Sequence, residues 1–303
     1  MPSPDPVHIR STLQVSIIAT AVIGAVGVVW GVVAGSQMIL LDGVYAVIGI
    51  VVSYLLLGAS ALAEGPPSRR FPFGRAGATP LAIAVQGLVL AATLVYAAVE
   101  AVFVIADGGS DIDAGWGVAY GAVATVVSVV VWRWLDRRAG TADVLVSEAT
   151  AWKVASLRGL GIIAGFVVLA LLEDSRWDAA APYVDPAMVL VTCVVFLPAP
   201  YRMVRATVDE VMEASPLPSV RVPVIEAIEA VSESYGLDEP VIRLTKLGPR
   251  LYVEVDVTVG RGVTVGQQHE VRVDLEKRLE RLPYDVWLTL EMLPRPDGAH
   301  EVR

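Results

Sequence analysis

Hydrophobic positions form six long runs in the first two thirds of the chain, each bounded by charged residues, proline or glycine. The runs cover residues 15–34, 38–63, 79–106, 115–132, 146–172 and 187–201. An α-helix of about 20 apolar residues spans the ~30 Å hydrocarbon layer of a bilayer. The pattern therefore predicts an α-helical membrane domain with six transmembrane helices.

The last third of the chain has shorter patterns. Residues 251–259 alternate between apolar and polar, the period of a strand with one buried face. Apolar residues recur at helical spacing before and after this strand: Val222, Ile225, Ile228 and Val231, then Val271, Leu275 and Leu279. Residues 240–247 and 285–292 fit two further strands. The order helix, strand, strand, helix, strand predicts a small α+β (αββαβ) domain of ferredoxin-like type.

These patterns divide the chain into four parts. We expect an N-terminal tail at 1–14, the membrane domain at 15–208, the α+β domain at 209–295 and a tail at 296–303. From Asp209 onward the chain holds 18 acidic and 11 basic residues, so most of its negative charge lies in this part. The C-terminal domain is therefore expected to be soluble and cytoplasmic.

Composition agrees with a membrane protein and excludes other classes. Of 303 residues, 55% are hydrophobic and 18% are charged, which is too apolar for two ordinary soluble domains. A net charge of −9 does not favour a nucleic-acid partner. The single cysteine, Cys193, cannot form an internal disulfide. No Walker loop, HExxH string or Ser/His/Asp order is present, so we expect neither an enzyme nor a cofactor.

The distribution of arginine predicts the orientation in the cell (plasma) membrane. Loops and ends on one side of the six spans hold nine arginines: Arg10, Arg69, Arg70, Arg75, Arg133, Arg137, Arg138, Arg202 and Arg205. The other side has Arg176 alone, among aspartate and glutamate residues. Because cytoplasmic loops carry the excess of Lys and Arg, both termini are expected to be cytoplasmic.

Several short strings have an order and spacing that resemble the cation diffusion facilitator family. They are Leu41-Asp42-Gly43, Phe71-Pro72-Phe73-Gly74-Arg75, Tyr96 with Glu100, Asp185-Pro186, Gly248-Pro249-Arg250-Leu251-Tyr252-Val253-Glu254-Val255, Thr264-Val265 and His269-Glu270. The resemblance covers nearly the whole chain. It implies six spans, an αββαβ cytoplasmic domain that forms a homodimer, and exchange of divalent metal ions for protons. Where the family often has loop histidines, this chain has Phe71 and Arg75.

The family's metal ligands in the membrane are also replaced. The resemblance implies two pairs of ligands on the second and fifth spans, each pair four residues apart and so on one helix face. Together they would build a tetrahedral site of the kind that zinc prefers. Counted from the matching strings, the positions are Tyr45 and Gly49 on the second span and Ala151 and Ala155 on the fifth. A zinc site of the family's usual kind is therefore not expected.

Two charged residues, Asp42 and Arg158, lie near the replaced ligand positions in the second and fifth spans. The second and fifth spans run antiparallel, so residues at equal depth should have a constant sum of residue numbers. The replaced ligand positions pair at a sum of 200, and so do Asp42 and Arg158. We hypothesise an Asp42–Arg158 ion pair in which the guanidinium takes the place of a bound cation. The alternative is a structural pair that only fixes helix packing.

Five further residues are candidates for a functional role. Tyr45, Glu148 and Lys153 join Asp42 and Arg158 as candidates for the transport pathway. Tyr45 can instead pack, Glu148 can be interfacial, and Lys153 can extend its stem to the membrane surface. In the C-terminal domain, the resemblance places His269 and Glu291 at metal-ligand positions, whereas a solvated helix histidine is the alternative for His269.

The resulting prediction is a secondary transporter that exports a divalent cation from the cell. Its partners are the membrane, the divalent cation, the proton and a second copy of the chain, bound through the cytoplasmic domain. Carboxylate and carbonyl donors favour hard ions such as Mg²⁺ or Mn²⁺ over Zn²⁺. The alternative is a transport-inactive family member that acts as a regulatory or hetero-oligomer partner subunit.

Overall fold

The computed structural model describes residues 6–63, 65–139, 143–173, 175–260 and 262–294. The tail predicted at 296–303 and the first residues of the tail predicted at 1–14 lie outside the described residues. The chain forms two compact units. The first comprises Met1–Tyr54 and Gln86–Tyr201, and the second comprises Leu55–Val85 and Arg202–Arg303.

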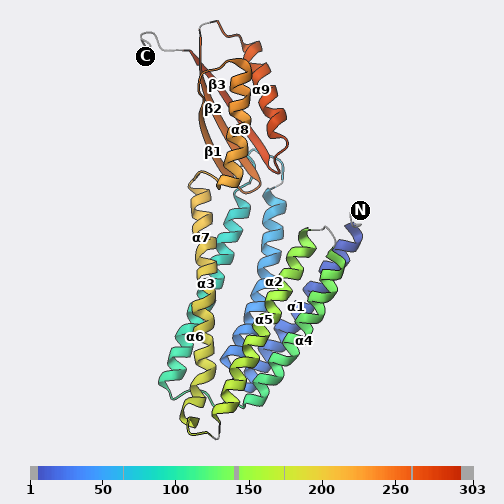
Figure 1. Ribbon diagram of the computed structural model, residues 1–303, viewed down its shortest axis with the longest axis vertical. Coiled ribbons are helices and arrows are strands. Elements are labelled where there is room, and N and C mark those ends of the chain that lie inside the picture. The colour runs from blue at the N-terminus through green and yellow to red at the C-terminus, as the bar shows by residue number, and fades with distance from the viewer. Residues whose placement is uncertain (1–5, 64, 140–142, 174, 261, 295–303) are drawn as a thin grey trace. The chain divides into compact units, whose positions relative to one another are not determined.

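Six stretches of the described chain are helical, long and apolar enough to cross a membrane, as predicted. The helices are α1 (Pro6–Ala34), α2 (Gln37–Ala63), α3 (Ala78–Ala106), α4 (Ala114–Ala139), α5 (Asp143–Leu172), α6 (Val184–Phe196) and α7 (Pro198–Val211), labelled in Figure 1. The sixth stretch, Asp178–Val211, contains a 3₁₀ turn, α6 and α7, and it is longer than the predicted run at 187–201. Helix α7 begins at Pro198, where the missing N–H of proline costs no helical hydrogen bond.

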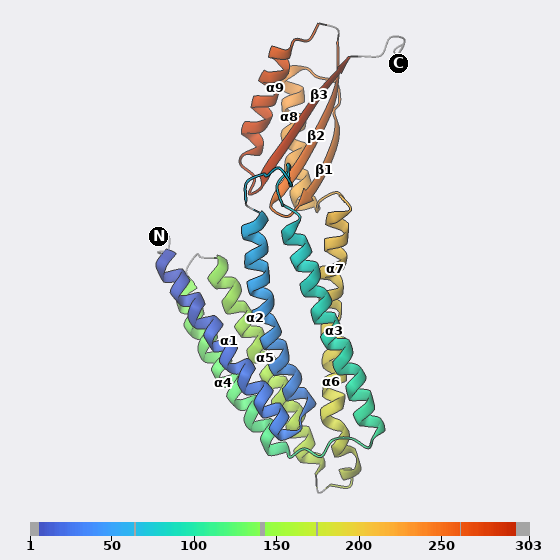
Figure 2. The same cartoon turned by 180° about the vertical axis from the view of Figure 1, so that it is seen from behind.

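Glycines set two close helix pairs in the first unit. Gly27 of α1 lies against Gly43 of α2, so the backbones of these two helices approach closely at this point. Gly117 and Gly121 of α4 face Phe166 and Ile163 of α5, and the sums of residue numbers stay nearly constant, as antiparallel neighbours require. Both views show α4 beside α5 (Figures 1 and 2).

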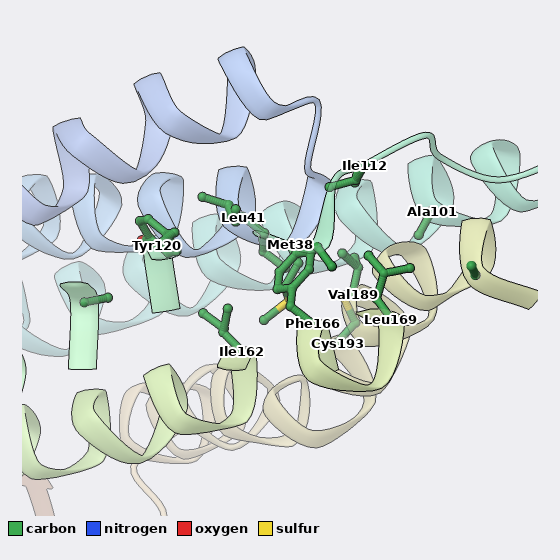
Figure 3. Close-up of a cluster of buried hydrophobic side chains, with 14 of the residues drawn as sticks. Met38, Leu41, Ala101, Ile112, Tyr120, Ile162, Phe166, Leu169, Val189 and Cys193 are labelled. Carbon is green, nitrogen blue, oxygen red and sulfur yellow. The ribbon is translucent and has the colours of Figure 1, made fainter. Parts of the chain in front are cut away.

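The buried core of the first unit draws on several helices. Figure 3 shows Met38 of α2, Phe166 of α5 and Val189 of α6 converging on one another. Tyr120 of α4 and Leu94 of α3 belong to the same cluster, and both are almost completely buried. The core therefore positions one face each of α2, α4 and α5, which carry the charged site described below.

The second unit contains the predicted αββαβ domain. Its elements are α8 (Pro218–Tyr235), β1 (Val241–Leu247), β2 (Arg250–Val259), α9 (Val265–Leu279) and β3 (Asp285–Pro294), and α8 and α9 cover one face of the sheet (Figure 2). The strand order is β1-β2-β3, with β1 antiparallel and β3 parallel to β2. The apolar positions of β2 are buried, as the alternation predicted.

Sequence patterns mark the ends of the two helices in this domain. Helix α8 begins at Pro218 and ends before Gly236, whose φ of 61° is the left-handed conformation that glycine adopts easily. A Thr264–Gln267 capping box starts α9. The predicted inner face of α8 was partly wrong, because Val224 is buried whereas Val222 is 45% exposed. The spacing of apolar residues in α8 allows either Val222 or Val224 to face the sheet. Packing against the sheet turns Val224 inward.

Candidate functional site

The expected contact between Asp42 and Arg158 is present in the first unit. The Nε atom of Arg158, on α5, lies 2.6 Å from Oδ1 of Asp42, on α2. The Asp42 side chain is 5% exposed and that of Arg158 is 24% exposed, so the carboxylate is the more buried partner. Oδ1 receives no hydrogen bond of ordinary geometry. The contact is therefore a close ion pair that leaves part of the carboxylate's hydrogen-bonding capacity unused.

A tyrosine completes the site from a third helix. The hydroxyl of Tyr120, on α4, donates a 2.8 Å hydrogen bond to Oδ2 of Asp42. Tyr120 is 1% exposed, and its ring meets that of Trp30 edge-on, with centroids 5.9 Å apart. A hydrogen bond to a charged acceptor is stronger than one between neutral groups. The carboxylate is thus held by α4 and α5 together.

A cavity lies beside the ion pair. It is small, about 20 Å³, and is lined by Met38, Leu41, Asp42, Tyr45, Leu94, Arg158, Thr192 and Phe196. Most of this lining is apolar, so Asp42 and Arg158 supply its charge. The Arg158 guanidinium also lies over the Tyr45 ring, 5.6 Å from its centroid. Arg158 therefore contacts both the carboxylate and an aromatic surface next to it.

Helix α2 is fixed at its start by a second buried carboxylate. Asp185, at the beginning of α6, is 1% exposed and accepts hydrogen bonds from Ser36 Oγ and from the backbone N–H groups of Gln37 and Met38. Ser36 in turn accepts a hydrogen bond from the N–H of Ile39. These contacts satisfy N–H groups that have no partner within the helix, and the carboxylate suits the positive end of the helix dipole. They set the position of α2 one to two turns before Asp42.

The structure shows what surrounds the four replaced ligand positions. Tyr45 lines the cavity and packs against Phe196, with ring centroids 6.4 Å apart. A side chain added at Gly49 would meet no other atom within 4 Å. Ala151 is exposed and Ala155 is partly exposed. Of these four residues, only Tyr45 brings a polar atom to the cavity beside Asp42.

Glu148 and Lys153 lie elsewhere on α5. Glu148 accepts a 2.6 Å hydrogen bond from Ser16 on α1, and Ser16 accepts one of 2.7 Å from Trp152 Nε1. Ser16 is fully buried, so this cluster joins α1 to α5. Lys153 is exposed, and its Nζ lies 5.7 Å from the centroid of the Trp132 ring. Neither residue belongs to the lining of the Asp42 cavity.

The two candidate ligands in the C-terminal domain are both exposed, His269 on α9 and Glu291 on β3. Among the described residues, no group of three or more His, Cys, Asp or Glu side chains could hold a metal ion. On the sheet, Arg243 contacts Asp256 and Glu254. The hydrogen bond to Asp256, with the charges of Asp256 and Glu254, raises the pKa of the Arg243 guanidinium above its ordinary value.

Six membrane-spanning stretches, an ionisable pair among them and a small α+β domain define a multi-pass membrane protein of transporter type. Comparison with known families agrees with this class: residues 13–212 match the model of the cation efflux transmembrane domain. The match covers well over half of the chain, so the protein belongs to the cation efflux family, also called cation diffusion facilitators.

Two curated relatives extend the similarity to nearly the full length. The manganese efflux system protein MneP of Bacillus subtilis is 22% identical over 283 residues, which are 91% of this chain and 93% of the relative. The manganese efflux system protein MneS of the same organism is 21% identical over 276 residues, covering 89% and 90%.

Sequence reasoning missed Tyr120, Ser16 and Asp185 as members of these buried clusters. Asp185 stood in a recognised string, but nothing indicated that it would bind the start of α2. A tyrosine or serine in an apolar span is ordinary, so neither residue gave a signal. A search for polar side chains inside the predicted spans would have found Ser16 and Tyr120 without naming their partners, whereas Asp185 precedes the span predicted at 187–201.

Proposed function

We propose that the protein exports a divalent cation in exchange for protons, with Mn²⁺ as its substrate. Membership of the family and the two manganese efflux relatives support the choice of ion. The single structural observation that carries the proposal is the buried Asp42 carboxylate, which lies beside a cavity and is neutralised by the Arg158 side chain. In this proposal the protein lies in the plasma membrane as a homodimer with both termini cytoplasmic.

Arg158 acts as a tethered cation in this scheme. Its guanidinium neutralises Asp42 in the observed state, and the Tyr45 ring offers it a second favourable position nearby. When the guanidinium leaves the carboxylate, Asp42 and the neighbouring Tyr45 and Thr192 hydroxyls present hard oxygen donors, which suit Mn²⁺ better than Zn²⁺. Return of Arg158 restores neutrality after the ion has left.

Proton exchange follows from the same need for charge balance. A divalent cation carries two charges across the membrane in each transport cycle, and protons moving in the opposite direction, as in the exchange that the resemblance to the family implies, would limit the net charge moved. A pH gradient should therefore drive the flux, and flux of the cation should move protons in the opposite direction.

A second candidate function is a transport-inactive subunit that regulates or pairs with an active relative. The observation that favours it is the ion pair itself, because Asp42 is already neutralised without a metal. The described residues also contain no group of three His, Cys, Asp or Glu side chains able to hold a metal ion.

Flux measurements in proteoliposomes separate the two functions. With an internal manganese-sensitive dye and an imposed pH gradient, the exporter should move Mn²⁺, and Asp42→Asn should abolish the flux. Arg158→Met should also reduce it strongly, whereas the matched control Lys153→Met should not, because Lys153 is exposed on the same helix and is not in the cavity lining. No flux of Mn²⁺, Zn²⁺, Mg²⁺ or Co²⁺ by the unmodified protein would favour the inactive subunit.

A further inference from the structure

Two arginines share one aromatic ring in the connection between α2 and α3 (residues 65–77). The guanidinium of Arg70 lies 5.6 Å from the centroid of the Phe71 ring, and that of Arg75 lies 5.1 Å from it. Arg70, Phe71 and Arg75 are all exposed, and so is the neighbouring Arg69. The connection therefore gathers two positive charges on one ring, with a third beside them.

These charges have no counter-ion within the described part of the chain. Four other arginines of the same unit do contact a carboxylate: Arg243, Arg250, Arg272 and Arg278. No carboxylate among the described residues contacts Arg69, Arg70 or Arg75. Two guanidinium groups held on one ring repel each other, and an anion between them would turn that repulsion into attraction. Arginine is also well suited to phosphate, which its planar fork binds with two hydrogen bonds.

The position of the connection identifies the anion. It joins two helices that cross the membrane, so it lies at the surface where lipid phosphates are concentrated. We propose that Arg70 and Arg75, held by Phe71, bind the phosphate of an anionic phospholipid headgroup. This site requires only that α2 and α3 span the membrane, so it does not depend on the proposed transport function.

The same connection is fixed to the C-terminal sheet. The carbonyl of Phe73 accepts a 2.6 Å hydrogen bond from Arg250 Nη1, and the Phe73 and Trp287 rings meet edge-on at 6.0 Å. Gly248, in the β1–β2 turn, lies so close to the carbonyl of Ala76 that a side chain there would collide with it. Figure 2 shows the connection, in teal, next to this turn. Lipid bound at Arg70 and Arg75 should therefore stabilise the second unit as a whole.

Thermal unfolding of the full chain, purified in a neutral detergent and freed of lipid, tests the proposal. Dioctanoyl-phosphatidylglycerol should raise the unfolding midpoint with saturation, and dioctanoyl-phosphatidylcholine should raise it much less. Arg70→Gln/Arg75→Gln should require about 30-fold more phosphatidylglycerol for half of the effect, on a scale of about fivefold per arginine at a membrane surface. Raising the salt concentration should weaken binding to the unmodified protein, because salt screens exposed charges.

Three variants control for folding and for charge alone. Arg176→Gln removes another exposed arginine that lies over an aromatic ring, Trp177, and it should keep the full response. Arg70→Lys/Arg75→Lys keeps the charge and should keep more of the response than the glutamine pair, while Phe71→Ala should lose part of it. The proposal is overturned if the glutamine pair responds like the unmodified protein, if phosphatidylcholine acts equally well, or if glycerol 3-phosphate gives the same shift at the same concentration.

Discussion

Removal of the Arg158 charge should destabilise the protein far more than removal of most other basic side chains. In Arg158→Met, the Asp42 carboxylate remains 95% buried with Tyr120 as its only hydrogen-bond donor among the described residues. Leaving one member of a buried ion pair uncompensated costs about 3–5 kcal/mol. The Tyr120 hydrogen bond to Asp42 remains in this variant. We therefore expect the free energy of unfolding to fall by about 3 kcal/mol, at the lower end of this range.

The substitution Asp42→Asn should lower the free energy of unfolding by less than Arg158→Met does. In Asp42→Asn, Arg158 keeps its charge but is 24% exposed and lies over the Tyr45 ring, so it retains solvent and an aromatic contact. The double variant Asp42→Asn/Arg158→Met leaves no uncompensated charge. It should therefore be more stable than Arg158→Met alone, with a coupling energy of about 2 kcal/mol, within the range found for directly contacting residues.

Equilibrium unfolding of the four proteins in mixed micelles with increasing SDS, followed by circular dichroism, measures this cycle. Lys153→Met is the matched control, because its exposed ammonium group lies over the Trp132 ring and this contact should contribute about 0.5–1 kcal/mol. If the two single changes add within about 0.5 kcal/mol in the double variant, Asp42 and Arg158 are not energetically coupled and the reasoning fails.

Two further predictions concern the helices that hold the site, and a third concerns the C-terminal domain. Gly27→Val should lower the unfolding midpoint and the Mn²⁺ flux, because a Cβ at Gly27 would lie 2.7 Å from Tyr120 Oη, whereas Gly49→Ala, which points into open space, should be tolerated. Asp185→Ala removes the acceptor at the start of α2, and it should cost about 2 kcal/mol or more in the SDS assay, since a buried acceptor of several hydrogen bonds is lost. Leu275→Ala, at a position 1% exposed, should cost about 2–5 kcal/mol of stability, and a loss below 1 kcal/mol would contradict the observed packing of α9.

Regular geometry made part of the site predictable. The spacing of Asp42 and Arg158 relative to the replaced ligand positions was enough to pair them, because two antiparallel helices keep a constant sum of residue numbers at equal depth. Glu148 illustrates the limit of that reasoning. Its partners, Ser16 and Trp152, depend on how α1 packs against α5, which no pattern within either helix specifies.

The sequence by itself determined the six spans, the αββαβ order and the buried face of β2, because bilayer thickness and backbone periodicity act on short stretches of chain. The tertiary structure decided which rotation α8 adopts, with Val224 inward, and which polar groups meet. Tyr120 reaches Asp42 because the small residues Gly27 and Gly43 let α1 and α2 approach closely beside α4. Such contacts depend on the volumes and directions of side chains from segments far apart in the chain. Only tertiary packing determines how these side chains are placed relative to one another.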